Sequence, residues 1–125
     1  MSKTLLIVDD DDDIRDVAQL ALEMGSPWTL LTADSGAAGI ELLRSTTPDA
    51  ILLDVMMPGL DGLATLKALR SDPRTRDIPV IFLTAKSRPA DRDRLRQLDV
   101  AGVLAKPFDP IELPAQIAAL LGWPL

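Results

Sequence analysis

Five polar side chains that could do chemistry lie at the ends of apolar runs in this sequence. Asp9 and Asp10 follow the run TLLIV, and Asp54 closes the run AILLD. Thr84 closes PVIFLT, and Lys106 comes directly after GVLA. Carboxylates are ligands for hard cations, and an ammonium group balances their charge. Whether these side chains meet depends on the elements that contain the runs.

The apolar, β-branched runs alternate with amphipathic stretches along the chain. We predict five strands, over residues 4–8, 29–32, 50–54, 79–84 and 102–105. Apolar residues between them recur at helical spacing, so each gap is predicted to hold a helix. These residues are Ile14, Val17, Ala18 and Ala21, then Ile40, Leu42 and Leu43, then Leu63, Leu66 and Leu69, then Leu95 and Leu98.

A last helix follows the fifth strand, and the sequence is compatible with two starts for it. Asp109 can cap a helix that has Pro110 in its first position and Glu112 as the partner of a capping box. Pro114 lacks an N–H and crowds the preceding turn, which favours a start at Pro114 itself. Both starts stay open at this point.

The strands are almost entirely apolar, which is typical of a parallel sheet covered on both faces by helices. We therefore predict one doubly wound α/β domain. In such sheets right-handed crossovers place ligand sites beyond the carboxyl ends of the strands. The five polar side chains are predicted to converge on that edge.

Three carboxylates gathered in one place need positive charge. Each close pair repels by roughly 4 kcal/mol at an intermediate dielectric. Lys106 supplies one positive charge, and a hard divalent cation would supply two more. An all-oxygen ligand set completed by water suits magnesium, and the sum of charges is then zero.

Each residue also has a simpler interpretation. Five consecutive Asp occupy residues 9 to 13. We interpret Asp11, Asp12 and Asp13 as acids at a helix start that interact favourably with the positive end of the helix dipole. An EF-hand loop is excluded because Ile14 stands where Gly is needed and Leu20 where Glu is needed. Asp54 could cap a turn, Thr84 could fill a strand and Lys106 could be a surface lysine. Their joint placement at strand ends favours a site.

Composition excludes several classes of function. The 125 residues include no Cys and no His, so thiol and imidazole chemistry are absent. The net charge of -6 disfavours binding to nucleic acid or to anionic membranes. The apolar runs are too short to span a bilayer, so we expect a cytoplasmic protein.

Four segments resemble, in order and spacing, the receiver domain of bacterial two-component response regulators. They are VDDDDDIR at 8–15, LLDVMMPGLDG at 52–62, FLTAK at 82–86 and AKPF at 105–108. The resemblance implies a flavodoxin-like fold, with a five-stranded parallel sheet in the order 2-1-3-4-5 and five helices. It also implies a phosphoacceptor that takes a phosphoryl group from a sensor histidine kinase or a phosphotransfer protein.

The resemblance also implies a role for each site residue. Asp54 would be the phosphoacceptor and, with Asp9, Asp10 and the backbone carbonyl of Met56, would bind Mg2+. Thr84 would hydrogen-bond the new phosphoryl group, and Lys106 would contact another of its oxygens. A cis peptide bond is expected between Lys106 and Pro107.

The expected organisation is a single receiver domain over residues 1–125 without an output domain. The downstream target would be a protein bound at the face of the fourth helix, fifth strand and fifth helix. We expect no enzymatic activity beyond self-catalysed phosphorylation of Asp54 and autodephosphorylation. The alternatives are a receiver-like interaction module that works without phosphorylation, and a fragment of a longer regulator.

Other enzymes fit less well. The acidic loop after the first strand would repel the phosphate of a nucleotide. A phosphatase with an aspartyl nucleophile would want an acid two residues after Asp54, where this chain has Met56.

Some positions depart from the family pattern or lie where the family varies. Val103 stands where the family usually has Tyr or Phe, and Asp99 where Gly is common. Lys86 and Met56 lie where the family varies its dephosphorylation rate. Because Val103 is too short to move as an aromatic ring does, we expect the signal to pass through the backbone of residues 85–90. Arg88, Arg92, Arg94 and Arg96 would make the neighbouring surface basic and suited to an acidic partner.

Overall fold

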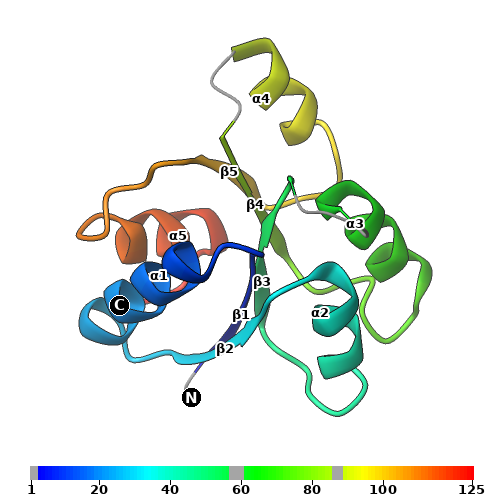
Figure 1. Cartoon of the computed structure of the whole chain (residues 1–125), viewed down its shortest axis with the longest axis horizontal. Helices are drawn as coiled ribbons and strands as arrows, with labels where there is room; N and C mark the ends of the chain where they lie inside the picture. The colour runs from blue at the N-terminus through cyan, green and yellow to red at the C-terminus, as the bar shows by residue number, and fades with distance from the viewer. Residues whose placement is uncertain (1–2, 57–60, 86–88) are drawn as a thin grey trace.

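The computed structural model describes residues 3–56, 61–85 and 89–125. Five parallel strands form one sheet in the order β2-β1-β3-β4-β5, as predicted (Figure 1). Their bounds are Thr4–Val8 for β1, Thr29–Ala33 for β2, Ala50–Asp54 for β3, Val80–Thr84 for β4 and Gly102–Ala105 for β5. The predicted strands are confirmed to within one residue at each end.

Helices cover both faces of the sheet. Their bounds are Asp12–Gly25 for α1, Gly36–Leu42 for α2, Gly62–Ser71 for α3, Pro89–Arg96 for α4 and Leu113–Leu121 for α5. In Figure 1, α1 and α5 lie on one side of the sheet, and α2 and α3 lie on the other. Each side has its own apolar cluster, and the strands contribute alternate side chains to the two.

Short polar side chains cap three of the helices. The Asp11 carboxylate accepts hydrogen bonds from the N–H groups of Asp13 and Ile14 at the start of α1. Ser35 caps α2 and Asp61 caps α3 in the same way. Such caps satisfy N–H groups that have no partner within the helix. The assignment of Asp11, Asp12 and Asp13 to the start of a helix is therefore confirmed.

One detail of the predicted helices is wrong. Leu98 lies beyond the end of α4 and is 41% exposed, because the chain tightens into a turn there and leaves for β5. Val17 lies in α1, as predicted; it is 42% exposed, and Ala18 and Leu22 form the buried stripe of the helix. The regular part of α5 begins at Leu113, close to the later of the two predicted starts. Asp109 caps the preceding turn.

Gly62 permits a close approach that sets the position of α3. It is the first residue of α3, and its N–H donates to the carbonyl of Val55. A Cβ atom at Gly62 would lie 2.3 Å from the carbonyl oxygen of Asp54 and 2.7 Å from the Cα of Val55. Both distances are far below van der Waals contact, so only Gly fits against the backbone of the strand that ends in Asp54.

We therefore expect Gly62→Ala to destabilise the protein by about 3 kcal/mol, at the upper end of the usual cost of overpacking. Urea denaturation measures this cost. Gly39→Ala is the matched control, because the nearest atom to its Cβ would be a Val8 methyl group at 3.2 Å, a side-chain atom and not backbone. Equal losses of stability in the two variants would contradict the proposed close approach.

Candidate functional site

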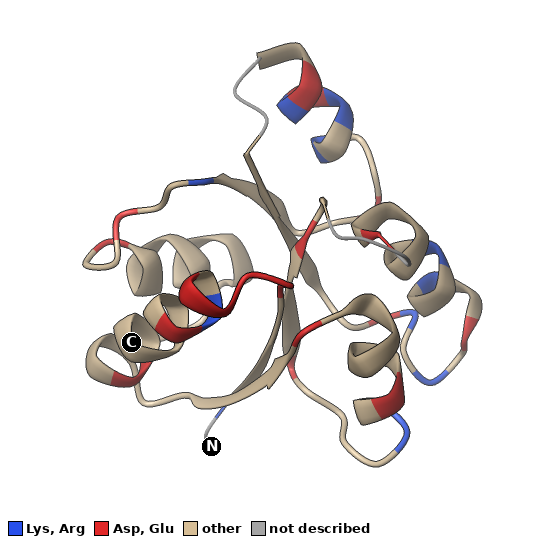
Figure 2. Cartoon of the chain, in the orientation of Figure 1, with Lys and Arg blue, Asp and Glu red and all other residues tan. Residues whose placement is uncertain are grey.

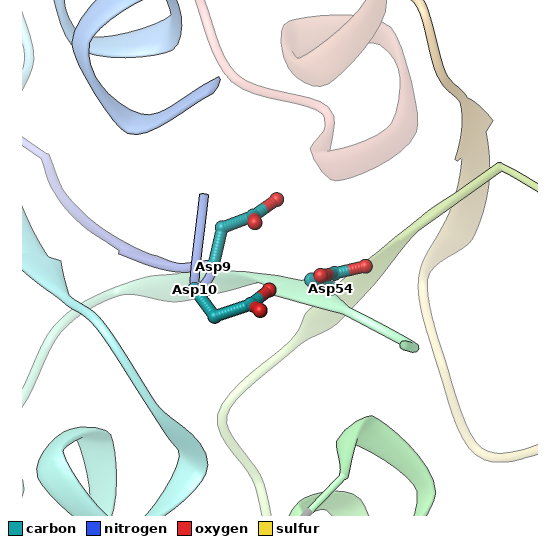
Figure 3. Close-up of side chains that lie close together, drawn as sticks. All are labelled: Asp9, Asp10 and Asp54. Carbon is teal, nitrogen blue, oxygen red and sulfur yellow. The ribbon is translucent and has the colours of Figure 1, made fainter. Parts of the chain in front are cut away.

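The predicted site residues come together at the carboxyl end of the sheet. Asp9 follows β1, Asp54 ends β3 and Thr84 ends β4, and all three are buried. Asp10 is exposed at the rim. Oxygen atoms of Asp9, Asp10 and Asp54 lie within 4.8 Å of one another. Figure 3 shows the three side chains side by side where β1 and β3 end.

Lys106 connects two of these carboxylates. Its Nζ lies 2.7 Å from Asp9 Oδ2 and 3.2 Å from Asp54 Oδ1. The backbone N–H of Lys106 donates to the carbonyl of Thr84 at 2.8 Å, which ties the segment after β5 to the end of β4. The Lys106–Pro107 peptide bond is cis, as expected.

Backbone N–H groups also bind carboxylate oxygens of Asp9 and Asp54. Asp9 Oδ1 accepts a hydrogen bond from the N–H of Asp11 at 2.9 Å. Asp54 Oδ1 accepts one from the N–H of Met56 at 3.1 Å. These bonds orient Asp9 and Asp54 before any ligand arrives, and so reduce the cost of ordering them on binding.

The electrostatic environment disfavours the ionised form of Asp54. Burial, the largest cause, and the charge of Asp9 together raise the pKa of Asp54 from 3.8 to about 6, against the opposing effects of Lys106 and the Met56 N–H. Burial lowers the pKa of Lys106, but its contacts with Asp9 and Asp54 outweigh burial, so the pKa is raised. Lys106 therefore remains a cation.

The residues present fit a magnesium ion. Three carboxylates face one ammonium group, which leaves two negative charges unbalanced. The ligand atoms are all oxygen, and the exposed Asp10 leaves the site open to solvent. Figure 2 shows acidic residues continuing from the end of β1 into the start of α1. The pattern favours a hard divalent cation over a transition metal.

Sequence reasoning missed two residues that support this site. Gly62 allows α3 to lie against the backbone of Asp54 and Val55. Arg15 donates from Nη1 to the carbonyl oxygen of Asp9 at 2.7 Å. Arg15 is the only basic residue between Lys3 and Arg44, and this isolation was the one available signal. Gly62 had no comparable signal.

Comparison with known proteins identifies the family. The model of the response regulator receiver domain matches residues 5–118. The chain belongs to the response regulator receiver domain family. The match confirms the resemblance, and the strand order confirms the predicted fold. Receiver domains of this family act as phosphoacceptors in two-component signalling.

Individual relatives agree with this assignment. The chain is 37% identical to the phosphate regulon transcriptional regulatory protein PhoB of Pseudomonas aeruginosa, over 97% of the chain and 52% of that protein. It is 39% identical to the DNA-binding dual master transcriptional regulator RpaA of Synechocystis, over 94% of the chain and 48% of that protein. The chain thus spans about half the length of the curated relatives it matches.

A solved structure gives the same fold. The chemotaxis response regulator CheY4 of Vibrio cholerae superimposes with a TM-score of 0.87 at 26% identity. The match covers 96% of this chain and 99% of that one. Similar receiver folds therefore occur both within longer regulators and as chains of about this length.

The raised pKa of Asp54 predicts a pH-dependent effect of Asp54→Asn in metal-free protein. The folded state holds the Asp54 proton more tightly than the unfolded state, so ionisation costs stability as pH rises from about 4 to about 6. The loss is at most about 3 kcal/mol. Asn does not titrate, so we expect the variant to be the more stable protein at pH 7 and to lose this advantage at pH 4.

Denaturant unfolding with a chelator present, from pH 4 to pH 7, measures the difference. Asp16→Asn, at an exposed position of α1, is the control and should show no such trend. A difference between wild type and Asp54→Asn that stays constant over this range would contradict the assigned environment of Asp54.

Proposed function

We propose that this chain accepts a phosphoryl group on Asp54 from a phosphohistidine of a sensor histidine kinase or phosphotransfer protein, in a magnesium-dependent reaction. The observation that supports this most is the buried pair of Asp9 and Asp54 held by one ammonium group, with Asp10 at the rim. In this proposal the Asp54 carboxylate is the nucleophile. The neighbouring carboxylates favour a bound cation, and Lys106 can contact a phosphoryl oxygen.

The transfer needs little covalent help from the protein. A carboxylate oxygen of Asp54 attacks the phosphorus atom, and an O–P bond forms as the N–P bond of the phosphohistidine breaks. The electron pair of that bond returns to the imidazole nitrogen, which takes up a proton. Positioning and neutralisation of the phosphoryl oxygens carry the catalysis.

Each site residue has a role in this proposal. Lys106, already 3.2 Å from Asp54 Oδ1, turns its ammonium group to a phosphoryl oxygen. The hydroxyl of Thr84 donates to a second oxygen. Magnesium held by Asp9, Asp10, Asp54 and the carbonyl of Met56 would neutralise the remaining charge of the phosphoryl group.

Donor and target are separate molecules in this proposal. The 125 residues include no His, so the phosphohistidine must come from outside this sequence. We propose a cytoplasmic receiver that catalyses only its own phosphorylation and autodephosphorylation, binds a downstream protein and does not itself bind nucleic acid. Its net charge of -6 supports the last point. Within the part of the chain that the structure describes, no helix is long and apolar enough to cross a bilayer.

Acetyl phosphate with magnesium should add one phosphoryl group to the wild-type protein, and intact-mass spectrometry detects it. Asp54→Asn keeps the shape of the side chain but removes the nucleophile, so it should gain none. Omission of magnesium should slow the wild-type reaction by at least about tenfold, since the unbalanced charge then stays in place. An Asp54→Asn variant phosphorylated at the wild-type rate would exclude Asp54 as acceptor. A wild-type protein that is never phosphorylated would favour the phosphorylation-independent module.

The proposed output surface lies on α4, β5 and α5. Val103 is 8% exposed and packs in the same apolar cluster as Phe82 and Leu95, so it is already inside the protein. A groove of about 470 Å³ is lined by Arg96 of α4, residues 100–104, and Gln116, Ala119 and Leu120 of α5. We propose that an apolar segment of a partner protein binds in this groove.

The charge of α4 is more balanced than the sequence predicted. Arg96 forms an ion pair with Asp93, and Asp91 lies in the first turn of the helix. Figure 2 shows acidic and basic segments together along α4. Arg88 and Lys86 lie outside the described residues. An acidic partner is therefore supported less strongly than a partner with an apolar contact surface.

Beryllofluoride, a mimic of the phosphoryl group, should shift amide resonances at residues 84–90 with little change in the Val103 side chain. The phosphoryl group draws the Thr84 hydroxyl inward and moves the chain that follows. The branched Cβ of Val103 restricts χ1, and the side chain is already buried, so it does not move between surface and interior as an aromatic ring can. A rotamer change at Val103, or shifts confined to the metal pocket, would contradict this path.

A further inference from the structure

Arg15 has an unusual environment for a residue in the first turns of an exposed helix. It follows the run of five Asp residues and is the only basic residue between Lys3 and Arg44. Its side chain is only 17% exposed, whereas that of the neighbouring Asp12 is 82% exposed. A long cationic side chain is buried to this degree when its donors have fixed partners.

Both ends of the guanidinium group have such partners. Nη1 donates to the carbonyl oxygen of Asp9 at 2.7 Å. Nη2 forms an ion pair with Oδ1 of Asp12. Arg15 thus connects the exposed Asp12 carboxylate to the backbone of the buried Asp9.

The Asp9 carbonyl belongs to the planar peptide that leads into Asp10. The other groups of Asp9 are already held: its N–H donates to Ala33, and its carboxylate binds Lys106 and the N–H of Asp11. The bond from Arg15 fixes the remaining polar group and with it the plane of the Asp9–Asp10 peptide. The bond thereby restricts the backbone position from which the exposed Asp10 side chain extends.

We propose that Arg15 is a positioning residue for the magnesium site. It holds the Asp9–Asp10 peptide so that both carboxylates face the ion, and Asp12 holds Arg15 in place. This inference rests on the proposed function, because it assumes that Asp9 and Asp10 bind magnesium. It gives Asp12, interpreted from sequence only as a helix-start acid, a second role.

The proposal predicts that removal of the Arg15 side chain changes magnesium affinity in the direction opposite to that expected from charge alone. Arg15 is a cation close to a cation site, so its charge alone weakens magnesium binding, and Arg15→Ala should tighten it. If Arg15 orients the ligands, the same substitution should weaken binding. Residues that orient metal ligands through a hydrogen bond typically change affinity by about 10- to 100-fold.

Calorimetric titration of the metal-free protein with magnesium chloride separates these cases. We expect Arg15→Ala to raise the magnesium Kd about tenfold. Arg15→Lys keeps the charge but cannot bridge two partners with a planar fork, so it should fall between wild type and Arg15→Ala. It also serves as the test variant if Arg15→Ala does not fold.

Asp12→Ala and Asp13→Ala form a matched pair for the second contact. Both remove one acid from the first turn of α1, but only Asp12 is paired with Arg15. Asp12→Ala should raise the Kd more than Asp13→Ala does. Addition of Asp12→Ala to Arg15→Ala should cause little further loss, because the two residues act through one contact.

An Arg15→Ala variant with an unchanged or lower magnesium Kd would overturn this inference, whatever its melting temperature. Equal effects of Asp12→Ala and Asp13→Ala would remove Asp12 from it. A wild-type protein without measurable magnesium binding, or an Asp10→Ala variant with wild-type affinity, would overturn the proposed metal site as well. The two failures are therefore distinguishable.

Discussion

The ion pairs of Lys106 with Asp9 and Asp54 are the interaction on which the rest of the structure depends. The two carboxylates end neighbouring central strands, and the fold buries both. Without a cation between them they would repel strongly in a medium of reduced dielectric. Lys106 allows the two acids to coexist, yet one positive charge does not balance three carboxylates. These ion pairs therefore hold the site together, but two negative charges remain without a compensating cation.

The sheet explains why these particular residues meet. Thr84 pairs with Ala105 in register, and the next N–H, that of Lys106, bonds to the Thr84 carbonyl. This carries the ammonium group from the edge strand towards the centre of the sheet. Gly62 allows α3 to begin directly against the backbone of Asp54 and Val55. Burial of charged groups near Asp54 lowers the stability of the folded protein. Such a loss is common where a functional site must stay reactive.

Much of the fold and the set of acids could be predicted from sequence because both depend on local patterns. Apolar runs that alternate with amphipathic stretches predict the strands. Five polar residues were found because they end or closely follow a strand: Asp9, Asp10, Asp54, Thr84 and Lys106. Arg15 and Gly62 were missed because their contacts with the site are to backbone carbonyls, those of Asp9 and Val55, which no side-chain pattern reveals. Leu98 was misplaced because helical spacing does not tell where a helix ends.

Magnesium-dependent stability tests the central claim most directly. At about 100 times the dissociation constant, a ligand that binds only the folded state adds about 2.7 kcal/mol to the free energy of unfolding. We predict a stabilisation of this order for the wild type at neutral pH, nearly the same gain for Asp13→Ala, and a strongly reduced gain for Asp10→Ala. A wild-type protein that magnesium does not stabilise, or an Asp10→Ala variant that it stabilises as fully, would contradict the charge deficit on which this account rests.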